Sequence, residues 1–270
     1  MPFAELDAAT RVHYLVAGEP GDETTPDLVL VHGTGGGALT TWAHLMEPFG
    51  AGRRRVIAID YSGSGETTDD GASLTLERLA AQVRAVIDEA VGDDRPFDLL
   101  GFSLGACVAT QLAASDPRGL RRLMLLSGWI DTTGDARAGL QFGLWRRLHA
   151  TDPQALAEHL ALTGFSAGYY DGRPTKAVEQ SLATTIATLA PGFDRQCELD
   201  TRVDLTTVAP LVTAPTLAIV ATDDQMVPPH HGRALAAAIP GARVEELPSG
   251  HLSMYEVPAE LTARVLAFLD

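Results

Sequence analysis

The chain of 270 residues is 46% hydrophobic and carries a formal net charge of −15 at pH 7. Its length suits one large α/β domain with an insertion, and its acidic charge argues against nucleic acid and an anionic membrane surface as partners, because both would repel it. We expect a cytoplasmic protein, because no apolar run is long enough to span a membrane, the start MPFAELDAATR lacks the features of a secretory signal, and two cysteines are too few for a disulfide framework.

Predicted strands alternate along the chain with predicted helices. Short apolar runs predict buried strands at 27–33 and 54–61 and further strands at 97–103, 122–129 and 216–222, and RVEELPS at 243–249 predicts a sixth strand. Helices are predicted near 41–49 and over 74–91, 104–115 and 261–269. Strands that are apolar throughout, with helices between them, indicate an α/β fold in which a mostly parallel sheet is covered on both faces.

The alternation breaks once, after the fourth predicted strand. From there to about residue 212 no strand pattern occurs, and two segments, 136–150 and 153–164, carry apolar residues at helical spacing. We therefore predict a helical cap at 131–205, inserted into a core domain formed by 1–130 and 206–270. The cap is expected to cover the carboxyl edge of the sheet.

Two segments fit the pattern Gly-x-Ser-x-Gly, which marks a reactive serine on a sharp turn between a strand and a helix. GFSLG at 101–105 has a predicted strand before it and a predicted helix after it. GFSAG at 164–168 follows a helical pattern that ends at a glycine, and it precedes the turn-forming residues YYDGRP. We therefore predict that Ser103 is a nucleophile and that Ser166 lies in a turn between cap helices.

A serine hydroxyl needs a base that removes its proton and an acid residue that orients the base. Two downstream segments, ATDDQMVPP at 221–229 and SGHLSMYEVP at 249–258, supply these residue types. Each segment follows a predicted strand, so we expect both at the same sheet edge as Ser103. The pattern itself leaves Asp223 and Asp224 open as the acid residue.

Together with HGTGGG at 32–37 and DYSGSG at 60–65, these segments resemble the α/β-hydrolase family over nearly the whole chain. The order serine, aspartate, histidine is also the order in that family. The resemblance implies a capped α/β hydrolase with a catalytic triad of Ser103, Asp224 and His251. Asp224 is selected over its neighbour because the acid of the family stands four residues before a proline.

The resemblance also implies an oxyanion hole, which stabilises the negative charge that develops on a substrate carbonyl oxygen. One donor is the backbone N–H of Leu104, the residue after the nucleophile. The other is the backbone N–H of Thr34, in the glycine-rich loop after the first predicted strand. Gly35 is the alternative donor, and it is expected to let the chain approach a bound substrate closely.

On the predicted cap helix at 136–150, Phe142 and Trp145 lie three residues apart on one stripe. This stripe either packs the cap onto the core domain or roofs the pocket above Ser103 and contacts the substrate. An apolar roof favours a substrate with an apolar acyl or alkyl portion. The candidate substrate-binding residues are therefore Phe142, Trp145 and Gly35.

A serine nucleophile implies acyl transfer to water through an acyl-enzyme, a reaction that needs no cofactor and no metal ion. We expect a small-molecule acyl substrate, and our first prediction is a carboxylic ester or lactone hydrolase. Three alternatives stay open: a thioesterase or cyclase acting on an acyl chain carried by CoA or a carrier protein, a hydrolase of carbon–carbon bonds, and a ligand receptor that has lost turnover. The sequence indicates neither a carrier protein nor an oligomeric state.

Overall fold

The computed structural model describes residues 2–20, 24–93 and 95–270. Within these ranges, eight strands form one sheet, in the order β1 (Phe3–Asp7), β2 (Thr10–Ala17), β4 (Val56–Ile59), β3 (Asp27–Val31), β5 (Phe97–Phe102), β6 (Leu120–Leu126), β7 (Thr216–Ala221) and β8 (Arg243–Leu247). The strands from β4 to β8 in this order are parallel, whereas β2 pairs antiparallel with both β1 and β4. The predicted α/β fold with a mostly parallel sheet is therefore confirmed.

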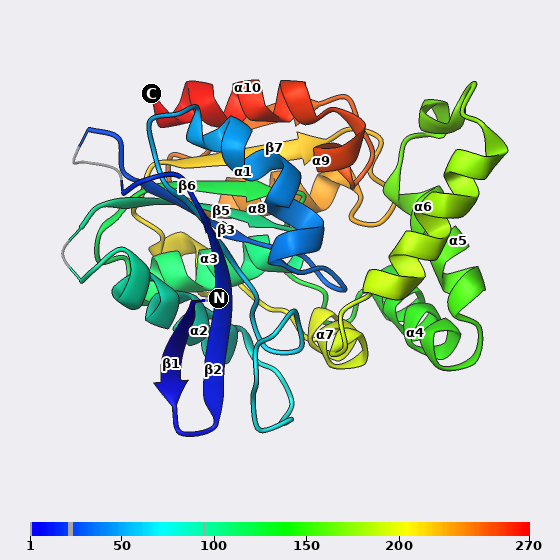
Figure 1. Cartoon of the computed structure of the whole chain (residues 1–270), viewed down its shortest axis with the longest axis horizontal. Helices are drawn as coiled ribbons and strands as arrows, with labels where there is room; N and C mark the ends of the chain where they lie inside the picture. Colours follow the sequence, from blue (N-terminus) through cyan, green and yellow to red (C-terminus); the bar gives the residue numbers. More distant parts are fainter. Residues whose placement is uncertain (1, 21–23, 94) are drawn as a thin grey trace.

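Helices cover both faces of the sheet (Figure 1). One face packs against α1 (Ala43–Gly50), α9 (Ser253–Glu256) and α10 (Pro258–Leu269), and the other packs against α2 (Leu76–Ala90), α3 (Leu104–Ser115) and α8 (Pro229–Ala238). The sequence of strand β3 is apolar from Leu28 to Val31 because its side chains are buried on both faces of the sheet. Val29 and Val31 enter the cluster with α2 and α3, while Leu28 and Leu30 enter the cluster with α1 and α10.

The sequence prediction misses the N-terminal hairpin of β1 and β2. Strand β1 forms the edge of the sheet and β2 lies next to it, and both mix buried with exposed residues. Charged side chains such as Glu5 and Arg11 interrupt the apolar pattern that identifies the inner strands. The predicted strand at 97–103 also ends one residue early, at Phe102, because the backbone of Ser103 leaves the extended conformation.

A helical insertion lies between β6 and β7, at one end of the sheet (Figure 1), where the sequence predicts a cap. Its helices are α4 (Ala136–Thr151), α5 (Pro153–Gly164), α6 (Thr175–Thr188) and α7 (Phe193–Asp200). The insertion leaves and rejoins the core domain at one place. Asp131 and Asp204 form a β-bridge there, and the backbone N–H of Leu205 donates to the carbonyl oxygen of Ile130 at 2.8 Å. We call residues 131–205 the cap from here on.

Two aspartates begin the first two cap helices. Asp135 accepts hydrogen bonds from the backbone N–H groups of Arg137 and Ala138, and Asp152 accepts one from that of Ala155. Such side chains satisfy N–H groups that have no partner within the helix. The break between α4 and α5 is therefore encoded locally, by Asp152 followed by proline.

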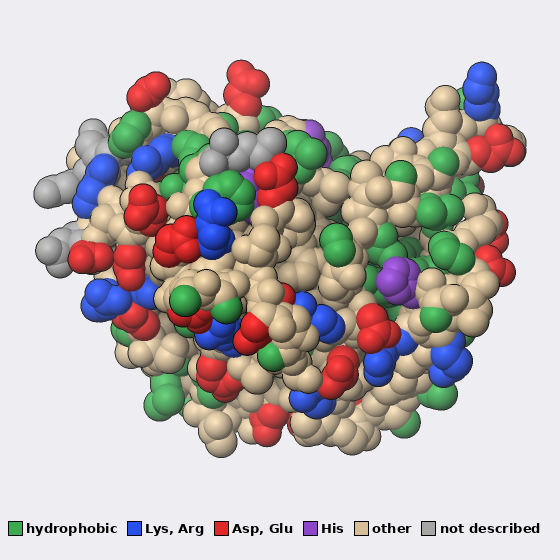
Figure 2. Space-filling model, turned by 60° about the horizontal axis from the view of Figure 1, so that its bottom comes forward, with side chains coloured by type: hydrophobic (Ala, Val, Ile, Leu, Met, Phe, Trp, Pro, Cys, Tyr) green, Lys and Arg blue, Asp and Glu red, His purple; other side chains and the backbone are tan. Residues whose placement is uncertain are grey.

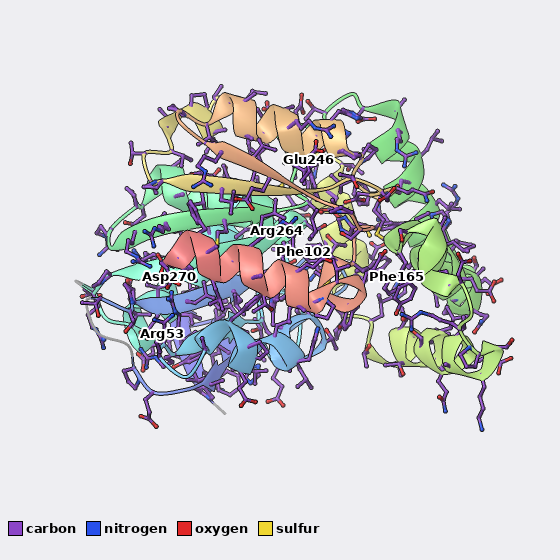
Figure 3. The ribbon with its side chains drawn as sticks, turned by 90° about the horizontal axis from the view of Figure 1, so that it is seen from above. Arg53, Phe102, Phe165, Glu246, Arg264 and Asp270 are labelled. Carbon is purple, nitrogen blue, oxygen red and sulfur yellow. The ribbon has the colours of Figure 1, made fainter. Side chains whose placement is uncertain are left out.

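The surface carries charged side chains of both signs (Figure 2). On the face in Figure 2, acidic and basic side chains are interspersed. In the described ranges no helix is long and apolar enough to cross a bilayer, and no group of three or more potential metal ligands occurs. Seen from above (Figure 3), α10 crosses the sheet and ends at Leu269, and the carboxylate of the next residue, Asp270, pairs with Arg53 at 3.4 Å. Phe165 lies where the cap meets the core domain.

Candidate active site

Ser103 occupies the sharp turn between β5 and α3. Its φ is +55°, a conformation that few residues other than glycine adopt. The flanking positions have no room for a side chain: a Cβ on Gly101 would lie 2.2 Å from the carbonyl oxygen of Gly105, and one on Gly105 would lie 2.3 Å from that of Val31. The turn therefore holds the Ser103 hydroxyl at the carboxyl edge of the sheet and at the N-terminus of α3.

The structure brings Ser103, His251 and Asp224 together, although 148 and 27 residues separate the two contacting pairs. The Ser103 Oγ lies 3.0 Å from the Nε2 of His251, and the Nδ1 of His251 lies 2.7 Å from the Oδ2 of Asp224. All three side chains are buried. This is the geometry in which a histidine accepts the serine proton while a carboxylate fixes its orientation.

The two adjacent aspartates, Asp223 and Asp224, differ in their contacts. The second carboxylate oxygen of Asp224 accepts hydrogen bonds from the backbone N–H groups of Met226, at 2.9 Å, and Val227, at 2.7 Å. Asp223 is exposed, and its carboxylate accepts from the neighbouring Thr222 hydroxyl. Asp224, which contacts His251, is thus the residue that the family resemblance selects.

The loop after β3 carries the second predicted oxyanion donor. A Cβ on Gly33 would lie 2.7 Å from the Cβ of Ser103, so the loop passes directly beside the nucleophile. Within the described ranges, the backbone N–H groups of Thr34 and Leu104 donate to no other residue. The N–H of Gly35 is already used, because it donates to the Oε1 of Gln196 at 2.8 Å. The N–H groups of Thr34 and Leu104 are therefore available as oxyanion donors. Gly35 lines the pocket, but its N–H is not available for this role.

Two polar side chains near this loop are structural. His32 donates from Nδ1 to the carbonyl oxygen of Gly33 at 2.7 Å, and burial lowers the pKa of its imidazole, which favours the neutral ring. Asp60 contacts the Nδ1 of His13 at 2.7 Å and accepts from the backbone N–H of Ala38 at 2.6 Å. Both residues brace the chain around the glycine-rich loop.

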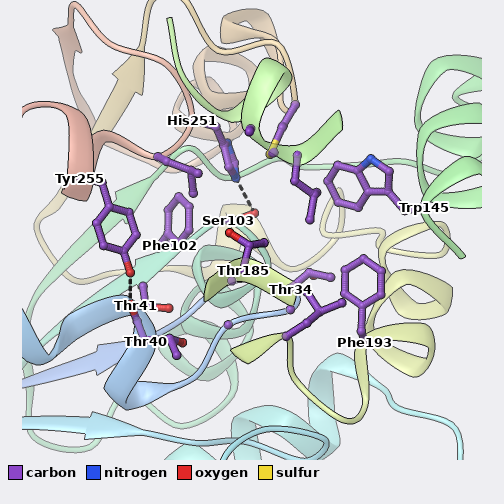
Figure 4. A pocket seen from close by; sticks show the side chains of 18 of the residues that line it. Thr34, Thr40, Thr41, Phe102, Ser103, Trp145, Thr185, Phe193, His251 and Tyr255 are labelled. Carbon is purple, nitrogen blue, oxygen red and sulfur yellow. Dashed lines mark hydrogen bonds between the residues drawn. The ribbon is translucent and has the colours of Figure 1, made fainter. Parts of the chain in front are cut away.

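A cavity of about 170 Å³ lies in front of Ser103, between the core domain and the cap. In Figure 4, Ser103 lies at the centre, Phe102 stands on the core side, and Trp145 and Phe193 stand on the cap side. Its walls are mainly apolar, with Thr, Ser and Gln side chains between the apolar ones. Among the described residues that line it, none is Asp, Glu, Lys or Arg.

Phe142 and Trp145 combine the two roles that the sequence left open. They pack edge to face, with ring centroids 5.2 Å apart, in an apolar cluster that includes Phe193 of α7 and Met226 of the core domain. Both also line the cavity. The stripe thus joins the cap to the core domain and forms part of the pocket roof.

The second Gly-x-Ser-x-Gly segment serves as a contact between the cap and the core domain. The backbone N–H and the hydroxyl of Ser166 both donate to the carboxylate of Glu256, which also accepts from the backbone N–H of Gly250 at 3.0 Å. The N–H of Leu252 donates to the carbonyl oxygen of Gly164 at 2.8 Å. The turn after α5 is therefore fixed beside the loop that carries His251.

Sequence reasoning missed Gln196, Asp200 and Glu256. Gln196 and Asp200 are fully buried polar residues on α7, and the Oδ2 of Asp200 accepts from the Thr34 hydroxyl at 2.7 Å. Desolvation raises the pKa of the Asp200 carboxyl to about 8, although the hydrogen bond from Thr34 acts in the opposite direction. For Gln196 and Asp200, the only available signal was their polarity within an amphipathic cap helix, which does not identify a partner.

The two cysteines take no part in this site. Both Cys107 and Cys197 are buried free thiols, and burial raises the pKa of each. A thiol with a raised pKa is a poor nucleophile at neutral pH.

Comparison with known proteins gives consistent matches over nearly the whole chain. A sequence profile described as the alpha/beta hydrolase family matches residues 28–265. Pyrrolizixenacetamide deacetylase from Xenorhabdus hominickii is 39% identical over 249 residues, which cover 92% of this chain and 92% of that protein. The crystal structure of an enol-lactonase from Burkholderia xenovorans superposes with a TM-score of 0.83 at 28% identity and covers 99% of both chains. A hydrolase from Pseudomonas aeruginosa superposes with a TM-score of 0.82 at 27% identity, over 99% of this chain and 97% of that one.

Proposed function

The chain belongs to the alpha/beta hydrolase family, and from this premise we propose that it is a serine hydrolase that cleaves an uncharged carboxylic ester or lactone through an acyl-enzyme at Ser103. The observation that carries the proposal is the continuous hydrogen-bond chain from Ser103 through His251 to Asp224. Enzymes that hydrolyse acyl compounds use this arrangement to turn a weakly nucleophilic hydroxyl into a strong one.

In the proposed reaction, the Nε2 of His251 takes the proton of the Ser103 hydroxyl while the Oγ attacks the substrate carbonyl carbon. The carbonyl oxygen becomes negatively charged and accepts hydrogen bonds from the N–H groups of Thr34 and Leu104. The bond to the leaving alcohol then breaks, and that alcohol takes the proton from His251. Water, deprotonated by His251, then attacks the carbonyl carbon of the acyl-enzyme. The bond from that carbon to the Ser103 Oγ breaks, the Oγ takes the proton back from His251, and the acid is released. Asp224 keeps the imidazole oriented and stabilises its charged form throughout.

The lining of the cavity supports an uncharged substrate. A carboxylate or phosphate on the substrate would lose its hydration on entry and would find no Lys or Arg among the described lining residues. The apolar side chains of the roof, Phe142, Trp145 and Phe193, instead favour an apolar acyl portion. The Thr and Gln side chains between them suit a few neutral polar groups.

A second candidate is the hydrolysis of an N-acyl amide. The observation that favours it is the 39% identity to a protein named as a deacetylase over 92% of both chains. The same triad and oxyanion donors serve this reaction, because only the leaving group changes from an alcohol to an amine. His251 must then protonate the leaving nitrogen before the carbon–nitrogen bond breaks.

The thioesterase alternative has less support. Docking of an acidic carrier protein or of CoA phosphates needs free basic residues near the pocket. Arg146 of the cap forms a two-bond ion pair with Asp194, at 2.8 and 2.9 Å. Arg173 lies over the ring of Tyr169, 3.6 Å from its centroid. No specific observation favours carbon–carbon bond hydrolysis.

The experiment is a set of substrates that share one acyl group. Hexanoyl p-nitrophenyl ester, a hexanoyl anilide, a six-carbon lactone, hexanoyl-CoA and an ester whose acyl chain ends in a carboxylate are compared for wild type and Ser103→Ala. We expect ester and lactone hydrolysis that disappears in Ser103→Ala, and a value of kcat/KM for the carboxylate-bearing ester at least about tenfold lower. Faster hydrolysis of the anilide would favour the second candidate. Binding without turnover of any substrate would favour a receptor.

A further inference from the structure

Two side chains of the cap helix α7 contact the loop that carries the proposed oxyanion donor. The Oε1 of Gln196 accepts from the N–H of Gly35 at 2.8 Å, and the Oδ2 of Asp200 accepts from the hydroxyl of Thr34 at 2.7 Å. Both α7 side chains are fully buried. Because α7 belongs to the cap, these contacts cross from the cap to a loop of the core domain that lies beside Ser103.

The hydrogen bonds of Gln196 fix the orientation of its amide. Its Nε2 donates to the hydroxyl of Ser64 at 2.9 Å, so its Oε1 is the atom that faces Gly35. The carbonyl oxygen of Gly35 in turn accepts from the N–H of Ala190, just before α7, at 3.0 Å. The cap thus holds both the N–H and the carbonyl of Gly35.

The peptide group before Thr34 is also fixed, from the core side. The carbonyl oxygen of Gly33 accepts from the Nδ1 of His32 at 2.7 Å and from the N–H of Gly36 at 3.2 Å. A trans peptide is planar, and its N–H points opposite to its carbonyl. The N–H of Thr34 therefore points away from His32. The contacts of α7 fix the next peptide, so Thr34 is held from both sides.

We propose that Gln196 and Asp200 are positioning residues for the oxyanion hole, which keep the backbone N–H of Thr34 directed at the carbonyl that Ser103 attacks. The proposal rests on the proposed function, because it assigns Ser103 as the attacking group. It makes the cap part of the machinery that stabilises the transition state, in addition to its role as a pocket roof.

The environment of Asp200 suits a neutral hydrogen-bond acceptor. A pKa of about 8, raised by burial, keeps the carboxyl protonated at neutral pH. The titratable side chains that act on it electrostatically are Tyr61, Cys107 and Cys197, and burial raises the pKa of each, so they carry no charge there. A carboxylate at this position would repel the developing oxyanion, so neutrality is compatible with the proposed role.

The test compares variants of α7 with a control on the same helix. Gln196→Leu removes the contact to Gly35, and Thr34→Val removes the contact to Asp200 from the loop side while it keeps the backbone N–H. Asp200→Ala removes the carboxyl, and Asp200→Asn retains an acceptor. Arg195→Gln is the matched control, because Arg195 binds Asp69 of the core domain at 2.8 Å without contacting the loop.

Four quantities are measured for each variant: kcat, KM, and the affinities for two ketones of the same shape. A trifluoromethyl ketone adds the serine oxygen and forms an oxyanion, whereas the matching methyl ketone mainly reports ground-state binding. We expect Gln196→Leu, Thr34→Val and Asp200→Ala to lower kcat by about 10- to 100-fold, less than or similar to the loss of a whole oxyanion donor. Trifluoromethyl ketone affinity should fall by the same factor, and KM and methyl ketone affinity should change by less than about threefold.

Asp200→Asn and Arg195→Gln should stay within about threefold of wild type in all of these quantities. Gln196→Leu with unchanged kcat and trifluoromethyl ketone affinity would overturn the proposal, as would an equal loss in Arg195→Gln, which would indicate general docking of the cap. Thermal unfolding confirms that each variant is folded. If wild-type Ser103 is not labelled by a fluorophosphonate probe, the proposed function fails, whereas normal labelling with unaffected α7 variants refutes this inference alone.

Discussion

The core domain and the cap are held together in different ways. In the core domain, side chains on both faces of the sheet are buried in two large apolar clusters. The cap has one small cluster around Phe142 and Trp145, and α6 contains no buried residue. Polar contacts also join the cap to the core domain, among them those from α7 to the loop at Thr34 and from Ser166 to Glu256.

The core domain and the cap therefore contribute differently to the site. The core domain holds Ser103, Asp224 and His251 at the carboxyl edge of a sheet that is packed between the two apolar clusters. Two of the polar contacts of the cap reach opposite halves of the site, since one touches the proposed oxyanion loop and the other lies beside His251. We therefore expect changes in the core triad to abolish turnover, and changes in the cap to alter its rate or selectivity.

The sharpest contrast is between the serine of the core domain and the serine of the cap. Ser103→Ala should abolish labelling by a fluorophosphonate probe and lower kcat by about 10⁶-fold, because it removes the nucleophile. Ser166→Ala should retain labelling and lose at most about tenfold in kcat/KM, because it removes one hydrogen bond to Glu256. Mass spectrometry of the labelled peptide identifies the site, and labelling that persists in Ser103→Ala would assign the nucleophile elsewhere.

Within the core domain, neighbouring aspartates should differ strongly. Asp224→Asn should lower kcat by about 10⁴-fold, because the amide cannot stabilise the charged imidazole of His251. Asp223→Asn should change kcat by less than about twofold, since its side chain is exposed and does not contact His251. Steady-state kinetics on the two purified variants measures the difference. A larger effect at Asp223 would contradict the geometry of the acid position.

The buried carboxyl of the cap should make stability depend on pH. Asp200 has a pKa of about 8 when folded and about 3.9 when unfolded, so the folded state binds the proton more tightly. The contribution of this proton binding to the free energy of unfolding is fully present below pH 4. It declines by about 1.4 kcal/mol per pH unit up to about pH 8. The asparagine in Asp200→Asn does not titrate. The free energy of unfolding of this variant, relative to that of wild type, should therefore rise from pH 4 to about pH 8 and stay constant above it.

Urea unfolding at pH 5, 7 and 9 measures that difference. Asp194→Asn on the same helix is the control, because its hydrogen bond to Arg146 lowers the pKa of that carboxyl, and its titration is complete below pH 5. The difference between Asp194→Asn and wild type should therefore be constant over the three pH values. A constant difference for Asp200→Asn as well would show that its carboxyl is ionised in the folded state.

The smallest expected effect concerns the apolar roof. Values of kcat/KM should rise from acetyl to hexanoyl esters by at most about fourfold per carbon, because a buried methylene contributes about 0.8 kcal/mol. Trp145→Ala should flatten this dependence without preventing the labelling of Ser103. Leu140→Ala is the matched control, because Leu140 lies on the same helix and is 73% exposed. A steeper rise in Trp145→Ala, or a preference for acetyl in wild type, would contradict an apolar acyl site.

The sequence was most informative where function follows from local structure. Ser103 comes directly after a strand, and Asp224 and His251 lie in the loops that follow two other strands, so their approach to one sheet edge follows from the parallel strands. The edge hairpin of β1 and β2 was missed because its strands are only partly buried. Inner strands such as β3 and β5 were predicted from continuous apolar runs, whereas the mixed burial of β1 and β2 leaves no such run.

No local pattern in the sequence indicates which residues of the cap contact the core domain. Gln196 lies 161 residues from its partner Gly35, and Ser166 lies 90 residues from Glu256. Nothing in the periodicity of α7 distinguishes a polar residue that faces solvent from one that faces a loop of the core domain. Only the docked position of the cap shows which polar residues are buried, and that position depends on the packing of residues 131–205 as a whole.

The junction at Asp131 and Asp204 has a consequence for engineering. Because the chain leaves and rejoins the core domain at adjacent points, a segment from another protein can be grafted there without altering the strand order. A chimera made at these two positions would keep the triad but would lose Gln196 and Asp200. Because these two residues are proposed to position the oxyanion hole, the chimera would accept the substrate of the protein that supplied the cap and would turn it over slowly. Grafts that end before α7, at Gly192, keep both side chains and are the better starting point for changing selectivity.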